Sequence, residues 1–155
     1  MSTTHKYRVR STSTAVRSGL AIVEGIEPSI AFSAPPEFNG QAGHWTPEHF
    51  FVVAVASCFV STFSGMASNS NLEFFSLELE TEGTVVRDQA GWRFREVVLR
   101  PRLTITRAED RERAHRLLHK AEKNCLVGRS VACAVVLEPA LIIEEQPVLE
   151  SVTSF

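Results

Sequence analysis

The chain has 155 residues, 44% of them hydrophobic, with three cysteines and a formal net charge of −2. This length suits one hydrophobic core, so we expect a single domain over residues 1–155. The near-neutral charge gives no general attraction to phosphate or anionic lipid, which argues against nucleic acid or a membrane as a partner. The few cysteines, with no twin-arginine signal and no charged-then-apolar leader, predict a cytoplasmic location, where cysteines are more often catalytic or metal-binding than structural.

Short alternating runs in the first third of the chain predict three antiparallel strands. The runs lie at residues 6–10, 20–24 and 29–33 and are separated by Ser/Thr-rich stretches, Gly25 and Pro28. The prolines and glycines that follow residue 34 predict a loop.

A helix is expected from about residue 47 to residue 68. Thr46 suits the N-cap, Pro47 the first turn, and the Glu48 carboxylate complements the helix dipole. Residues 49–66 are apolar enough for a membrane span. Their serines, the lack of flanking Lys or Arg, and the amphipathic strands on either side favour a buried central helix instead.

The second half of the chain predicts a hairpin, a helix and a last strand. Residues 73–87 and 92–106 alternate in polarity around a Gly-containing turn. One face of the sheet is therefore expected to be exposed to solvent, and the other to pack against another element. A helix with apolar residues at helical spacing is expected over 108–124, a turn or short helical start over 127–130, and a strand over 131–144. The order βββ-α-ββ-α-β predicts an α+β fold with antiparallel sheets around the central helix, completed by dimerisation.

The cysteines differ in their surroundings. Cys58 lies inside the apolar helix, Cys125 ends the charged second helix, and Cys133 suits the core of the last strand. A thiol becomes a selective nucleophile where its thiolate is favoured, and a second thiol can then resolve its oxidised form. A buried cysteine is also simply a small core residue, and that alternative stays open for Cys58.

Several strings occur in a fixed order: Pro-Pro-Glu-Phe-Asn-Gly at 35–40, Trp-Thr-Pro-Glu-His-Phe-Phe at 45–51, Ala-Ser-Cys-Phe at 56–59 and Ala-Glu-Lys-Asn-Cys at 121–125. Together they resemble the OsmC/Ohr family of thiol-dependent hydroperoxide reductases, the osmotically inducible and organic hydroperoxide resistance proteins. The Trp-Thr-Pro-Glu start is closer to the OsmC-like branch. The resemblance spans about residues 17–144 and implies one OsmC-like domain in an intertwined homodimer.

The resemblance also implies a site and a reaction. Cys58 matches the peroxidatic cysteine, Cys125 the resolving cysteine and Glu48 the site glutamate, and Arg17 is a better match to the site arginine than Arg8 or Arg10. The implied activity is that of a peroxiredoxin-like oxidoreductase that reduces organic hydroperoxides, with hydrogen peroxide as a further candidate, in defence against oxidative stress. A Cys58–Cys125 disulfide would form and be opened by a small dithiol or thiol, a lipoyl-type dithiol among the candidates, without a bound cofactor or metal.

Helix geometry adds a constraint to this site. Ten residues separate Glu48 from Cys58, which is about 15 Å along a straight helix. We therefore expect shared sites in an antiparallel helix pair, where Arg17 and Glu48 of one chain serve Cys58 and Cys125 of the other.

The segment after Cys125 departs from the family pattern. Leu126 stands where the family commonly has proline, and Gly128 is expected to loosen the turn, so Cys125 is predicted to be weakly constrained. The nearby Arg129 is expected to lower the pKa of the Cys125 thiol.

Other interpretations compete with this one. His115 and His119, with Glu122 and Cys125, have a spacing that could ligate zinc. The phenylalanines of the central helix suit either an apolar substrate entrance or plain core; they are Phe50, Phe51, Phe59 and Phe63. A family member without turnover, acting as a redox sensor or as a small-molecule or thiol-binding protein, is the rival function.

Overall fold

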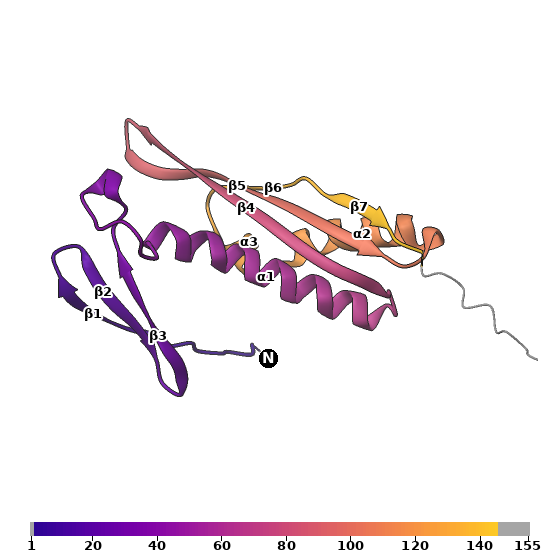
Figure 1. Cartoon of the computed structure of the whole chain (residues 1–155), viewed down its shortest axis with the longest axis horizontal. Helices are drawn as coiled ribbons and strands as arrows, with labels where there is room; N and C mark the ends of the chain where they lie inside the picture. The colour runs from indigo at the N-terminus through magenta and orange to yellow at the C-terminus, as the bar shows by residue number, and fades with distance from the viewer. Residues whose placement is uncertain (1, 146–155) are drawn as a thin grey trace, which may run out of the picture. The chain divides into compact units, whose positions relative to one another are not determined.

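The computed structural model describes residues 2–145, and in it the chain divides into two units, Met1–Phe51 and Val52–Phe155 (Figure 1). The first unit holds an antiparallel sheet of order β1-β2-β3. Its strands are β1 (Arg10–Ala15), β2 (Ser18–Val23) and β3 (Ile26–Ser33), followed by the short 3-10 helix η1 (Pro36–Phe38).

The first strand is displaced from its predicted position. We expected it at residues 6–10, but it lies at Arg10–Ala15 and pairs with β2 through the tight Val16-Arg17 turn. Every residue of β1 is exposed. Backbone pairing alone holds this edge strand, so its Ser/Thr-rich sequence carries no hydrophobic alternation by which it could be recognised.

The central helix α1 (Pro47–Asn69) begins where the sequence predicts. The Thr46 hydroxyl accepts the His49 N–H at 3.1 Å, and the His49 ring nitrogen Nδ1 accepts the Thr46 N–H at 3.1 Å. This reciprocal cap satisfies two backbone donors at the start of the helix.

Only one stripe of α1 is buried within the chain. Its fully buried residues are spaced four apart: Val55, Phe59, Phe63 and Ala67. The helix has the length and mean hydropathy, 1.9, of a membrane span, and 22% of that segment is buried. An apolar core or interface helix meets the same criteria.

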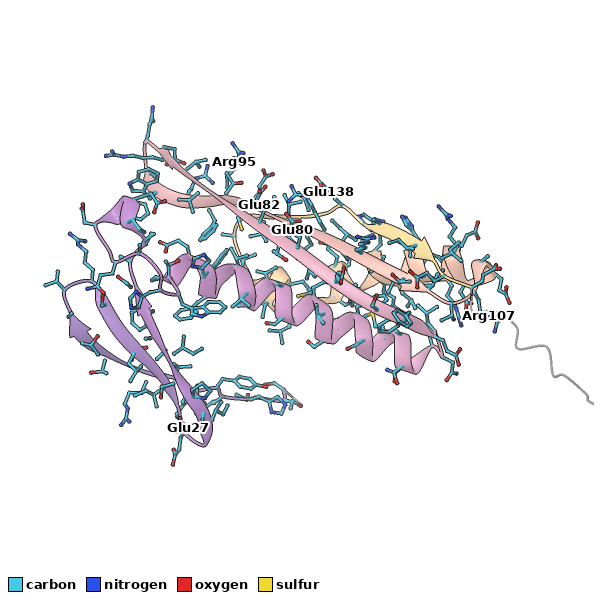
Figure 2. The ribbon with its side chains drawn as sticks, viewed as in Figure 1. Glu27, Glu80, Glu82, Arg95, Arg107 and Glu138 are labelled. Carbon is cyan, nitrogen blue, oxygen red and sulfur yellow. The ribbon has the colours of Figure 1, made fainter. Side chains whose placement is uncertain are left out.

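The second unit contains a long hairpin of β4 (Phe74–Asp88) and β5 (Gly91–Ile105). Its polar face carries an ion-pair network in which Arg100 contacts Glu82 at 3.4 Å and Glu138 at 3.1 Å, with Glu80 at 3.9 Å. Figure 2 labels the three glutamates. The β4–β5 hairpin therefore has the solvent-exposed polar face that the sequence predicts. On the other face, Phe63 of α1 meets Phe74 with ring centroids 5.6 Å apart.

The last strand differs from the prediction in two ways. It is split into β6 (Ala134–Leu137) and β7 (Ala140–Ile143), and both parts pair with β5 in parallel, so the sheet is mixed. Glu138 and Pro139 separate the two parts, and proline has no N–H to donate to a continuous ladder. The parallel pairing follows from the helical crossover that connects β5 to β6.

That crossover consists of η2 (Ala108–Asp110), α2 (Arg111–Asn124) and α3 (Leu126–Ser130). The apolar residues that predicted α2 are its buried face: Ala114, Leu117, Leu118 and Ala121. The α+β class and the element order are thus confirmed, with the final strand divided.

Candidate functional site

Cys58 and Cys125 lie next to each other within the second unit. Cys58 sits in the middle of α1, and Cys125 joins α2 to α3. The Cys125 sulfur lies 4.0 Å from the carbonyl oxygen of Val55, one turn before Cys58, and each thiol shifts the pKa of the other. Both thiols are free. The two cysteines that the sequence analysis singled out therefore lie close together in the reduced protein.

The burial of the two cysteines is the reverse of what their sequence surroundings suggest. Cys125 follows a charged helix yet is 1% exposed, whereas Cys58, in the apolar helix, is partly exposed. The Cys125 side chain turns inward, where its sulfur accepts the Gly128 N–H at 3.4 Å and lies 4.0 Å from the carbonyl oxygen of Val55. Cys125 has an extended backbone between α2 and α3, so its burial does not follow the helical pattern of the residues before it.

The prediction of a weakly constrained Cys125 is wrong for the same reason. Its sulfur acts as the N-cap of α3, so the turn is tied to the sulfur instead of being loosened by Gly128. A Cβ at Gly128 would lie 3.4 Å from that sulfur, so the glycine allows close contact. Burial, followed by the hydrogen bond with Cys58, raises the pKa of the Cys125 thiol, against the expected lowering by Arg129.

Cys58 is shifted in the opposite direction. Burial raises its pKa, but hydrogen bonds from the Val127 N–H, the Cys125 thiol, the Thr62 hydroxyl and the Leu126 N–H together outweigh burial and leave the pKa lowered. The Thr62 oxygen lies 3.9 Å from the Cys58 sulfur. Donors aimed at the sulfur stabilise its thiolate. Of the two thiols, Cys58 is the one that ionises first.

The sequence analysis did not identify Thr62 or the α3 backbone as hydrogen-bond donors to the Cys58 sulfur. Thr62 follows Cys58 by four residues, a helical spacing that places the two on one face, and this signal was readable. The backbone donors of Leu126 and Val127 had no such signal because every non-proline residue carries an N–H.

Arg17 and Glu48 both lie in the first unit, and the structure does not pair them. Arg17 is exposed and makes no ion pair within residues 2–145. Glu48 is partly exposed, but its Oε2 atom is buried and has no hydrogen-bond partner within that range. A buried carboxylate oxygen without a donor is costly.

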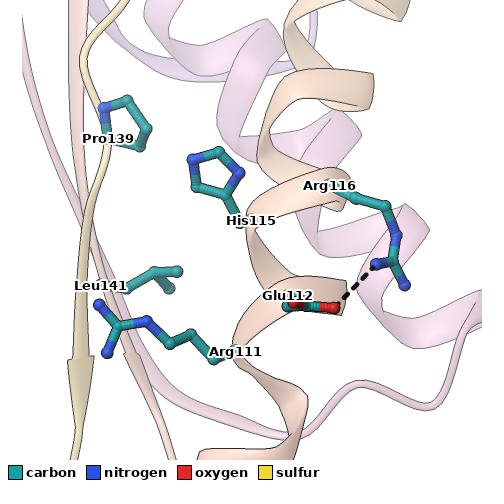
Figure 3. A pocket seen from close by; sticks show the side chains of 6 residues that line it. All are labelled: Arg111, Glu112, His115, Arg116, Pro139 and Leu141. Atoms are coloured by element: carbon teal, nitrogen blue, oxygen red, sulfur yellow. Dashed lines mark ion pairs between the residues drawn. The ribbon is translucent and has the colours of Figure 1, made fainter.

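The alternative zinc site does not assemble. The rings of His115 and His119 lie close, with centroids 4.6 Å apart, yet no group of three potential ligands forms within residues 2–145. Cys125 is turned away into the core. His115 instead lines an open cleft of about 590 Å³ between α2 and β7, where Arg116 pairs with Glu112 at 3.9 Å (Figure 3).

Of the two interpretations of the α1 phenylalanines, apolar entrance or plain core, the structure favours core for two of them. Phe59 and Phe63 are fully buried and belong to the core. Phe50 lies in the first unit, stacked on Trp45 with ring centroids 6.0 Å apart. Cys133 lies in a bend just before β6 and is half-buried, so it is not the strand-core residue that we expected.

Comparisons with known proteins agree on the family and fold. The family model for OsmC-like proteins matches residues 40–140. An uncharacterized protein of Bacillus subtilis (strain 168), YmaD, is 25% identical over 137 residues, which cover 86% of this chain and 91% of that protein.

Solved structures share the fold at low identity. An OsmC-like protein of unknown function from Vibrio cholerae has a TM-score of 0.77 and 23% identity, over 88% of this chain and 99% of that one. Organic hydroperoxide resistance proteins from Legionella pneumophila and Elizabethkingia anophelis have TM-scores of 0.70 and 0.71 with 18% and 16% identity; the matches cover 90% and 92% of this chain and 99% and 100% of theirs. From the match of the family model over residues 40–140, this chain belongs to the family of OsmC-like proteins.

Proposed function

We propose that this protein is a thiol-dependent peroxidase that reduces organic hydroperoxides, and hydrogen peroxide as a second candidate substrate, in defence against oxidative stress. The observation that supports this proposal most directly is that the pKa values of two neighbouring thiols are shifted in opposite directions. Cys58 has a lowered pKa and Cys125 a raised one, and the Cys125 sulfur lies 4.0 Å from the carbonyl oxygen of Val55, one turn before Cys58 in α1. Two structures with this fold come from proteins named for organic hydroperoxide resistance, which supports the choice of substrate.

The proposed chemistry proceeds in two steps. The Cys58 thiolate attacks one peroxide oxygen, the O–O bond breaks, and the leaving alkoxide takes a proton to become an alcohol while the sulfur is oxidised to a sulfenic acid. The Cys125 sulfur then attacks the Cys58 sulfur, and water leaves as the disulfide forms. A small dithiol or thiol, such as a lipoyl-type dithiol, returns two electrons and reopens the disulfide. The sulfurs carry the electrons throughout, so the scheme needs no bound cofactor.

The raised pKa of Cys125 fits this order of events. At neutral pH its thiol keeps its proton, and its presence lowers the pKa of Cys58, so it stabilises the nucleophile before the first step. Once Cys58 is oxidised, the neighbouring Cys125 would be in position to resolve it. Rapid capture protects a sulfenic acid from further, irreversible oxidation.

In this proposal Arg17 and Glu48 complete the site in a homodimer. The guanidinium would lie beside the Cys58 sulfur of the second copy and polarise the peroxide, and Glu48 would hold the guanidinium through a charge-assisted contact. Two observations support the pairing: the buried Glu48 oxygen lacks a donor, and Arg17 has no ion pair within residues 2–145.

The outward face of α1 supports a second copy as the partner. Five of its exposed residues are small and follow the three-four spacing of a helix–helix seam: Ala54, Ser57, Ser61, Ser64 and Ser68. The Ser57, Ser61 and Ser64 hydroxyls donate to carbonyls of their own helix and so need no further acceptor. Small side chains allow two helices to approach closely.

We place the protein in the cytoplasm in this scheme, since its thiols must be re-reduced.

The test follows peroxide consumption. We expect the reduced protein to consume cumene hydroperoxide catalytically with excess dithiol, and Cys58→Ser to abolish the reaction. Cys125→Ser should still be oxidised once, but should then lose activity progressively, because its sulfenic acid is not captured. Cys133→Ser is the matched control and should behave as the unmodified protein.

The same assay separates the rival function. One stoichiometric loss of thiol with no turnover, whichever dithiol is supplied, would favour a redox sensor over an enzyme. If no hydroperoxide oxidises Cys58, both the enzyme and the redox-sensor interpretations are contradicted. A small-molecule or thiol-binding protein would then be the remaining interpretation.

A further inference from the structure

Arg17 occupies an unusual backbone conformation. It is the second residue of the two-residue turn between β1 and β2, and its φ is +62°. This left-handed region is normally occupied by glycine or asparagine, and a larger residue is retained there only where its surroundings impose it. Something in the first unit must therefore hold the Arg17 backbone.

Two donors hold the Arg17 carbonyl oxygen. The Ala34 N–H donates to it at 2.9 Å, and the Ser33 hydroxyl donates to it at 3.4 Å. Ser33 is the last residue of β3 and Ala34 follows it, so the turn is fixed by the end of this strand as well as by the hairpin ladder.

Ser33 is a buried polar residue whose hydroxyl is fully used. It is 0% exposed, and its oxygen also accepts the Gln41 N–H at 2.9 Å and the Ser18 hydroxyl at 3.1 Å. One donated and two accepted hydrogen bonds exhaust the capacity of a serine hydroxyl. Its backbone N–H donates to the Trp45 carbonyl at 2.9 Å. One side chain thus joins the Arg17 turn to the loop that leads into α1.

We infer that Ser33 is a positioning residue for Arg17, holding the arginine backbone in the left-handed turn so that its side chain leaves the sheet in one direction. This inference rests on the proposed role of Arg17 in peroxide reduction. A fixed φ and ψ fix the direction of the Cα–Cβ bond, which reduces the conformational freedom that a long arginine must lose to reach a sulfur. Ser33 would act on the reaction only through Arg17.

A first experiment measures the turn without using activity. Trypsin cleaves after arginine, and the bond from Arg17 to Ser18 lies in this turn. We expect Ser33→Ala to speed cleavage there by roughly fivefold, the factor that one lost hydrogen bond is worth. Cleavage after Lys120 in α2 is the internal control and should not change. Ser18→Ala removes one contact of Ser33 but leaves the bond to the Arg17 carbonyl, so it should resemble the unmodified protein.

A second experiment measures whether removal of the Ser33 hydroxyl changes the rate of Cys58 oxidation. The rate of single-turnover oxidation of Cys58 by cumene hydroperoxide is measured for Ser33→Ala, Arg17→Ala and the double variant. We expect Ser33→Ala to slow oxidation roughly fivefold in the unmodified background and not at all beside Arg17→Ala. Ser33→Thr, which keeps a hydroxyl, should restore most of the rate.

The outcomes separate this inference from the proposed function. Equal slowing by Ser33→Ala in both backgrounds, or unchanged tryptic cleavage at Arg17, overturns the positioning role while leaving peroxide reduction intact. If Arg17→Ala has no effect on a rate that Cys58→Ser abolishes, the assignment of Arg17 fails and the positioning role fails with it. If Cys58 is not oxidised at all, the proposed function itself is wrong.

Discussion

At the scale of single residues, the Cys58 sulfur is surrounded by donors. The Thr62 hydroxyl comes from its own helix, the Cys125 thiol from the end of α2, and two backbone N–H groups from the start of α3. These contacts outweigh burial, and the pKa of Cys58 is lowered as a result. Because the pair is coupled, its titration has two apparent steps, the first mainly on Cys58 and the second mainly on Cys125.

The first prediction concerns pH. Since a lowered pKa means that the thiolate is present above that pKa and lost below it, alkylation of Cys58 by iodoacetamide should have its midpoint below pH 9.0, the ordinary thiol value. Cys125→Ala removes one donor and should move the midpoint upward, with a roughly fivefold slower reaction at pH 7. Mass spectrometry of the alkylated peptide measures the rate. A midpoint unchanged in Cys125→Ala, as expected for the control Cys133→Ala, would contradict the role of the Cys125 thiol.

The second prediction concerns the residue after Cys125. Leu126→Pro removes the backbone N–H that donates to Cys58, although proline suits the first position of a helix and should preserve α3. The apparent pKa of Cys58 should rise, by less than in Cys125→Ala because this donor is the weaker cause. Leu126→Ala is the matched control: the side chain is 72% exposed, so its removal should leave the titration unchanged. The same rise in both variants would mean that the leucine side chain, not the N–H, matters.

At the scale of elements, α1 lies close to the β4–β5 hairpin because the sheet carries a glycine beneath it. A Cβ at Gly83 would lie 2.6 Å from the Cγ2 of Val52 and 2.8 Å from the Cε1 of Phe94. Neither neighbour is the end of a long flexible side chain. The glycine is therefore required by close packing, and its φ is not in the left-handed region.

The third prediction follows from that contact. Gly83→Ala should lower the free energy of unfolding by about 1–3 kcal/mol, the usual cost of overpacking. Val52→Ala in the same chain should recover part of the loss, since the two changes share one contact. Urea unfolding of both single variants and the double variant gives the three values. Strictly additive values would show that the Val52 contact is not the cause.

At the scale of the whole molecule, much of the apolar surface of α1 stays uncovered within one chain. Its exposed seam of small residues suits a second copy, which in the proposed scheme also brings Arg17 and Glu48 to the thiols. The site would then depend on assembly, and loss of the dimer would slow peroxide reduction even with both cysteines intact.

The fourth prediction tests this dependence. Ser61→Arg places a long charged side chain in the middle of the seam and should shift the protein from dimer to monomer in analytical ultracentrifugation. Peroxide consumption should fall with it, while thiol content stays the same. Gln89→Arg adds the same charge in the exposed β4–β5 turn and should do neither. A dimer that persists in Ser61→Arg would place the interface elsewhere.

Much of this protein was predictable from local patterns. The capped start of α1, the long hairpin and the amphipathic α2 were read correctly because each has a period or a cap in the sequence itself. The edge strand β1 was misplaced since an exposed strand needs no apolar alternation. The division of the last strand at Pro139 was missed, and its parallel pairing depends on a crossover that no local pattern encodes.

The sequence by itself determined the order of elements, the family and the identity of the two candidate sulfurs, because these follow from residue types and their spacing. Only the tertiary structure decided that Cys125 is the buried member, that it caps α3, and that its thiol and the α3 backbone donate to Cys58. The physical reason is that a pKa depends on which donors surround a sulfur in space, and these donors come from segments distant in the chain. Residue spacing can identify a candidate nucleophile, but the donors that lower its pKa are brought together only by the folded structure.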